Sequence, residues 1–130
     1  MIDFFDSIKH FKPQEFDDPT LPGSSSNMSP EFVRLLDQLR DKLGYSLRIN
    51  SGFRTEEHNK QVGGKPNSAH TNGVAADIFC DTSQLRFDVV KVALELGFKR
   101  IGIGENFVHL DLSFDLPQAV LWLYPKGARG

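Results

Sequence analysis

Residues 68–79 run Ser-Ala-His-Thr-Asn-Gly-Val-Ala-Ala-Asp-Ile-Phe, and this pattern predicts a polar loop followed by a strand over residues 74–79. Asp77 is then a carboxylate inside an otherwise apolar strand, where burial is costly unless the charge is paired or binds a metal ion. His70 lies in the loop directly before this strand. The segment therefore places two polar groups that need partners close to one another.

A second apolar segment, residues 107–112, is also predicted to be a strand, with His109 and Asp111 on one face. A loop histidine, a strand aspartate and a histidine on a neighbouring strand can converge on one point. His70, Asp77 and His109 then match a catalytic zinc site, which has three protein ligands and one open position. Mononuclear iron accepts the same ligands, and satisfied core residues with no metal are the alternative.

Arg54 follows Ser-Gly-Phe directly after an expected strand over residues 46–50. An arginine at such a strand end can hold a carboxylate or stabilise an oxyanion through charge-assisted hydrogen bonds. The alternative is a simple ion pair with Asp77 or with a nearby glutamate. His58 lies on the short helix that follows, where a solvated helix face is the alternative to substrate contact.

Composition excludes several classes of protein. The chain has 130 residues with a hydrophobic fraction of 39%, so one domain spanning 1–130 is expected. The net charge of −2 gives no electrostatic basis for binding nucleic acid. Cys80 is the one cysteine, which excludes a disulfide scaffold. The longest apolar run, residues 119–124, is far shorter than the ~20 residues of a membrane helix.

The order of the expected elements predicts an α+β fold, with helices packed on a mostly antiparallel sheet. The predicted helices span residues 30–43, 56–62 and 84–96, with N-caps at Ser29, Thr55 and Ser83. Proline and glycine interrupt residues 1–28, which are expected to be mostly irregular.

Taken in order, the motifs resemble the zinc D-alanyl-D-alanine carboxypeptidase-like peptidases. These enzymes share the hedgehog/DD-peptidase fold with the vancomycin-resistance dipeptidases and the hedgehog signalling domain. The resemblance covers nearly the whole chain, and its most specific part is Ser-x-His-x-x-Gly-x-Ala-x-Asp. The matching segments are Ser51-Gly-Phe-Arg54, His58-Asn59, Val62-Gly-Gly64, Asn67 to Ile78, and Val108-His109-x-Asp111.

The resemblance implies one zinc ion bound by His70, Asp77 and His109, with catalysis through a zinc-activated water molecule. It implies that Arg54 polarises the scissile carbonyl group or steadies the tetrahedral intermediate. Ser68 matches a position that helps to hold the carboxylate of the substrate, and we also expect His58 to contact substrate. The implied substrates are the peptide stems and cross-bridges of bacterial peptidoglycan.

The general base is where the chain departs from its relatives. Dipeptidase-like relatives carry a glutamate three residues before the last histidine ligand, and Asn106 stands there in this chain. Glu105 is one residue further back, and Asp111 shares a face with His109. Asp111 either acts as the base or orients the imidazole of His109, Glu105 is the alternative base, and another residue or no efficient base is the third option.

The sequence thus predicts a zinc metallopeptidase that acts on peptidoglycan, either as a D-Ala carboxypeptidase or as an endopeptidase. A zinc-bearing module that binds cell wall or protein with little turnover is the alternative. A monomer without membrane insertion is expected. The first residues resemble no secretory signal peptide, so we expect synthesis in the cytosol and delivery to the cell wall by phage-type release or on a virion.

Overall fold

The computed structural model describes residues 3–130, and its longest helix, α1 (Pro30–Leu43), begins and ends where the sequence predicts. The Ser29 side chain accepts a hydrogen bond from the backbone nitrogen of Phe32 and caps the first turn. Gly44 takes a left-handed conformation at φ 79° and ends the helix. Local capping chemistry therefore determines both ends of α1.

The two other α-helices of residues 3–130 are α2 (Glu56–Gln61) and α3 (Ser83–Glu95). Thr55 caps α2 as predicted, since its hydroxyl oxygen accepts from the backbone nitrogen of His58. The predicted cap of α3 was wrong by one residue. Thr82 is the N-cap there, and its hydroxyl oxygen accepts from the backbone nitrogen of Leu85 at 3.1 Å.

The strands form one mixed sheet in the order β1-β2-β4-β3-β5. All neighbouring strands pair antiparallel except β3 and β5, which are parallel. The chain therefore has the α+β fold with a mostly antiparallel sheet. The strands are β1 (Ile49–Ser51), β2 (Ala75–Phe79), β3 (Arg100–Ile103), β4 (Phe107–Asp111) and β5 (Val120–Leu123).

Two of these strands, β3 and β5, were not predicted from the sequence. Strand β3 has only four residues, one of which is Gly102, so it lacks a run of strand-forming side chains. Strand β5 lies between Pro117 and Pro125, and each of its residues pairs with a β3 residue twenty positions earlier in the chain. Such pairing depends on the assembled sheet and not on local pattern.

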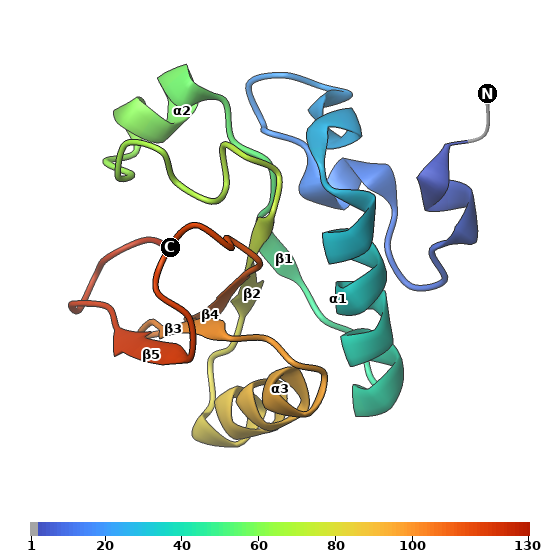
Figure 1. The fold of residues 1–130 in the computed structure, drawn as a ribbon, viewed down its shortest axis with the longest axis vertical. Coiled ribbons are helices and arrows are strands. Elements are labelled where there is room, and N and C mark those ends of the chain that lie inside the picture. Colours follow the sequence, from blue (N-terminus) through green and yellow to red (C-terminus); the bar gives the residue numbers. More distant parts are fainter. Residues whose placement is uncertain (1–2) are drawn as a thin grey trace.

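The sheet has one apolar face and one polar face. Alternate residues of the central strands, such as Ile78, Val108 and Leu110, are buried in the hydrophobic core with residues of α1 and α3. Helices α1 and α3 lie on this side of the sheet, whereas α2 and the C-terminal segment lie away from them (Figure 1). The other face is free to carry polar side chains.

Residues 3–28 are less irregular than predicted, because they form three short 3-10 helices at Phe4–Ser7, Pro13–Phe16 and Ser24–Asn27. Phe16 is fully buried, and its carbonyl oxygen accepts from the backbone nitrogen of Phe53 at 2.9 Å. Residues 1 and 2 of this predicted segment lie outside the described residues. Within residues 3–130, no helix combines the length and the hydropathy that crossing a membrane requires.

Candidate metal centre and cleft

One row of paired residues crosses the whole polar face of the sheet. Ser51 pairs with Asp77, Asp77 with His109, His109 with Gly102, and Gly102 with Trp122. Paired residues on adjacent strands project to the same face of a sheet. The register therefore places the carboxylate of Asp77 beside the imidazole of His109 near the centre of the sheet.

His70 reaches the same point from the loop before β2, and its ring is fully buried. The ring nitrogen Nδ1 lies 2.8 Å from the carbonyl oxygen of Gly52. A carbonyl oxygen only accepts, so Nδ1 carries the hydrogen and Nε2 of the neutral ring keeps its lone pair. Among the described residues Nε2 has no hydrogen-bond partner, although it lies 3.3 Å from Oδ1 of Asp77.

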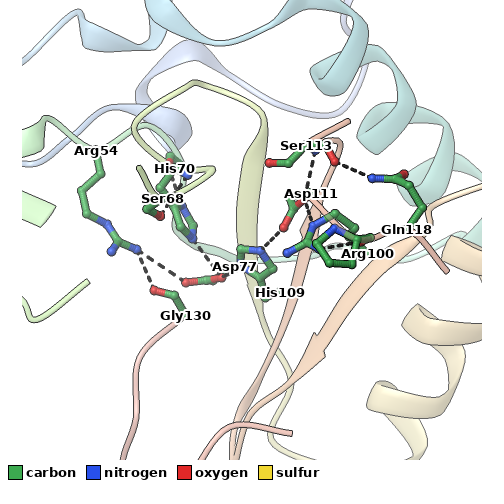
Figure 2. Close-up of polar contacts among 12 residues, drawn as sticks. Arg54, Ser68, His70, Asp77, Arg100, His109, Asp111, Ser113, Gln118 and Gly130 are labelled. Carbon is green, nitrogen blue, oxygen red and sulfur yellow. Dashed lines mark hydrogen bonds and ion pairs between the residues drawn. The ribbon is translucent and has the colours of Figure 1, made fainter. Parts of the chain in front are cut away.

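His109 is held from both sides by carboxylates. Its Nδ1 lies 2.9 Å from Oδ1 of Asp77, and its Nε2 lies 2.7 Å from Oδ2 of Asp111. Burial acts to lower the pKa of His109, but the hydrogen bonds and charges of Asp111 and Asp77 outweigh burial and raise it to about 9. Figure 2 shows this chain of contacts.

The ligand atoms offered by His70, Asp77 and His109 all lie within 4.8 Å of one another, and all three residues are buried. Burial acts to raise the pKa of Asp77, but its interactions with His70 and the hydrogen bond from His109 outweigh burial and hold that pKa well below its usual range. Two imidazoles and a carboxylate are a donor set that suits zinc. A metal ion would also satisfy the unpartnered Nε2 of His70, so these residues fit the implied zinc.

Arg54 lies on the other side of Asp77, and only 3% of it is exposed. Its Nη1 donates to Oδ1 of Asn59 at 2.9 Å, and its Nη2 lies 3.9 Å from Oδ2 of Asp77. Burial lowers the pKa of Arg54, although the charge of Asp77 acts in the opposite direction. The same Nη2 donates to the backbone oxygen of Gly130 at 2.9 Å (Figure 2).

A cleft of about 430 Å³ opens in front of Asp77 and Arg54. Residues of β1, of the 3-10 segment around residue 15, of α2 and of residues 128–130 line it. His58 faces this cleft, and its Nδ1 lies 3.0 Å from Oδ1 of the fully buried Asp18. Burial acts to raise the pKa of Asp18, but hydrogen bonds from Thr55 and Thr20 hold it at about 2. The imidazole of His58 therefore sits against a carboxylate that is ionised at neutral pH.

The three other predicted site residues lie further from the cleft. Ser68 accepts a hydrogen bond from the backbone nitrogen of His70 at 3.2 Å and is absent from the cleft wall, so its contact with substrate stays a prediction. Glu105 lines a separate shallow hollow beside Arg86. Both oxygens of Asp111 accept hydrogen bonds, from His109, Arg100 and Ser113. These contacts favour the orienting role of Asp111 over the role of base.

Sequence reasoning missed the residues that hold the ligands in place. The charged partners of Asp111 are His109 and Arg100, and nothing in the sequence marks Arg100 as one of them. The carbonyl oxygen of Gly52 and the side chain of Arg100 carry no local pattern that marks them as supports. Both become recognisable only when β1 and β3 are in place beside the ligand strands.

A family model described as Peptidase M15 matches residues 9–111 of the chain. The match covers most of the chain and includes all three predicted metal ligands. A search of curated proteins found no match.

Proposed function

Because the chain belongs to the peptidase M15 family, we propose that it is a zinc metallopeptidase that hydrolyses amide bonds in the peptides of bacterial peptidoglycan. The observation that carries this proposal is the geometry around Asp77. The unpartnered Nε2 of His70 lies on one side of its carboxylate, and Arg54 lies on the other side, where it already donates to the backbone oxygen of Gly130.

Zinc, when bound by His70, Asp77 and His109, would supply Lewis acidity that activates water and polarises a carbonyl group. Arg54 would hold the carbonyl oxygen of the scissile amide through a charge-assisted hydrogen bond, and its Nη2 already donates to a backbone oxygen, that of Gly130. The cleft beside Arg54 and Asp77 has a volume of about 430 Å³, which suits a short peptide. His58 would contact the substrate from the α2 side.

The support for peptidoglycan as the substrate is the resemblance of the motifs to D-alanyl-D-alanine carboxypeptidase-like peptidases. Within this class, the chain would either remove a terminal D-Ala or cut within a stem or cross-bridge. Peptidoglycan lies outside the cytoplasm, so we further propose that the protein acts on the cell wall after phage-type release or as part of a virion.

The test is digestion of purified peptidoglycan of several cross-link types, with products identified by mass spectrometry. Wild type, wild type with a chelator, and His70→Ala are compared. His10→Ala is the matched control, because His10 pairs with Asp41 away from the cleft. Chelator-sensitive release of free D-Ala indicates a carboxypeptidase, and larger fragments indicate an endopeptidase. Equal product from His70→Ala and wild type would contradict the metallopeptidase proposal.

A second candidate function is a zinc-bearing module that binds cell-wall peptide with little turnover. The observation in its favour is that neither predicted base faces the cleft freely, since Asp111 is fully hydrogen-bonded and Glu105 lies elsewhere. Zinc-loaded wild type that binds peptidoglycan but yields no product from any wall type would support this second function over the first.

A further inference from the structure

Arg100 on strand β3 does not line the cleft and contacts no predicted metal ligand directly, but it is linked to the ligand His109 through Asp111. Nε of Arg100 donates to Oδ1 of Asp111 at 2.8 Å, and the other oxygen of Asp111 lies 2.7 Å from Nε2 of His109. The backbone nitrogen of Ser113 donates to Oδ1 of Asp111 at 3.0 Å. The carboxylate of Asp111 is therefore fixed at both ends.

Arg100 is itself held in place by three contacts. Besides Asp111, its Nη1 donates to the carbonyl oxygen of Pro117 at 2.7 Å, and its guanidinium lies 4.9 Å from the ring centroid of Trp122. The Trp122 ring lies 5.5 Å from that of His109. Gly102 leaves room for this arrangement, because a Cβ there would lie 2.7 Å from atoms of the Trp122 ring.

The consequence concerns which nitrogen of His109 is free to bind a metal. An ionised carboxylate only accepts hydrogen bonds, so Asp111 keeps a hydrogen on Nε2. Nδ1 also faces a carboxylate, that of Asp77, but Asp77 is itself a proposed ligand, so Nδ1 is the nitrogen that would release its hydrogen and offer its lone pair when metal binds. Without Arg100, the buried Asp111 would lose its only cationic partner besides His109 among the described residues, together with one of the donors that orient it.

We infer that Arg100 is a positioning residue for the metal ligand His109, acting through Asp111 to fix both the tautomer and the ring orientation. This inference rests on the proposed metal site and adds a residue to it. Outer hydrogen-bond partners of metal-binding histidines change metal affinity by about 10–100-fold when they are removed. An effect of this size is the expected contribution of the Arg100–Asp111 pair.

The test compares Arg100→Gln and Arg100→Lys with Arg86→Gln and Arg86→Lys. Arg86 is a matched control, because its guanidinium also donates to backbone carbonyl oxygens, those of Cys80 and Glu105, but it lies away from the ligands. Zinc affinity is measured by competition with a chromogenic chelator. We expect Arg100→Gln to weaken zinc binding by about 10–100-fold, with a smaller loss for Arg100→Lys and no change for either Arg86 variant.

A second readout separates positioning from general loss of structure. In zinc-loaded protein labelled with ¹⁵N-histidine, wild type should show a hydrogen on Nε2 of His109 and metal on Nδ1. Arg100→Gln should show this signal shifted or split, while the signals of His70 stay in place. If Arg100→Gln fails to fold, the same two measurements on Arg100→Lys and Arg86→Lys test the role of Arg100.

The outcomes distinguish this inference from the proposed function. Zinc affinities and His109 signals of the Arg100 variants equal to those of the Arg86 variants would overturn the role of Arg100 alone. Wild type that binds no zinc would instead overturn the metal site on which the inference rests.

Discussion

The two histidines of the candidate metal centre are held in contrasting ways. The loop histidine, His70, is oriented by a main-chain carbonyl oxygen, that of Gly52. The strand histidine, His109, is oriented by side chains, first Asp111 and then Arg100. The first arrangement depends on the path of the backbone at residue 52, whereas the second depends on the identity of two side chains.

The two halves of the site thus differ in what orients their histidine, backbone for His70 and side chains for His109. The carbonyl oxygen of His70 also accepts a hydrogen bond from the backbone nitrogen of Arg54 at 3.2 Å. The loop that carries His70 therefore also holds the backbone of Arg54 in place. The His109 half instead lies in the middle of the sheet among buried charges. We therefore expect the two halves to respond differently to the same kind of change.

The largest expected effect is that of removing either ligand. His70→Ala and His109→Ala should each abolish stoichiometric zinc binding, measured by metal analysis after gel filtration, while His10→Ala retains it. The halves should differ in zinc-free protein. His109→Ala leaves Asp77 and Asp111 buried without a shared partner and should lower the free energy of unfolding by about 3–5 kcal/mol.

His70→Ala removes a buried ring but leaves the contacts of Asp111 in place, so its loss in zinc-free protein should be smaller. Urea denaturation in the presence of a chelator measures both variants. A larger loss for His70→Ala than for His109→Ala would reverse the comparison.

The next effect is the pH dependence of zinc binding. The pKa of His109 is raised to about 9, so in zinc-free protein the ring holds two hydrogens below that pH and must release one when metal binds. Zinc affinity should therefore rise about tenfold per pH unit from near neutrality to pH 9 and level off above it. Chelator competition across this range tests the prediction, and a flat profile between pH 7 and pH 9 would contradict it.

A pair of glycine substitutions sharpens the comparison. A Cβ at Gly52 would lie 2.7 Å from the Cα of Phe16, which is backbone, and one at Gly102 would lie 2.5 Å from a ring atom of Tyr124. Rings move more easily than packed backbone, so Gly52→Ala should destabilise more, by about 1–3 kcal/mol. Thermal and urea unfolding measure the stability of both variants. Equal losses of stability would show that the rings of Tyr124 and Trp122 are as rigid as the backbone of Phe16.

The smallest effect concerns the segment over the cleft. Arg54 holds the backbone oxygen of Gly130, where we propose that a substrate carbonyl binds. Removing residues 128–130 should free Arg54 and lower KM for a wall peptide by about tenfold, the lower end of what a hydrogen bond to a charged group contributes. Steady-state kinetics on a defined peptide test this, with Lys126→Ala as a control outside the segment. An unchanged KM would show that the segment does not compete.

The sequence by itself determined the features that depend on neighbouring residues. Ser29 and Gly44 mark the ends of α1 because capping acts over a single turn. His70 and Asp77 were recognisable together because a loop and the strand that follows it are close in space. The order of the motifs was enough to predict the family and the α+β fold.

Only the tertiary structure decided how these residues are supported. Strand β3 and its Arg100 acquire their meaning from pairing with β4, and the Gly52 carbonyl from its approach to the His70 loop. Such contacts join segments that are distant in the chain, and their free energy depends on burial and register, which no local pattern records. The candidate ligands are therefore evident in the sequence, whereas their orientation is a property of the assembled sheet.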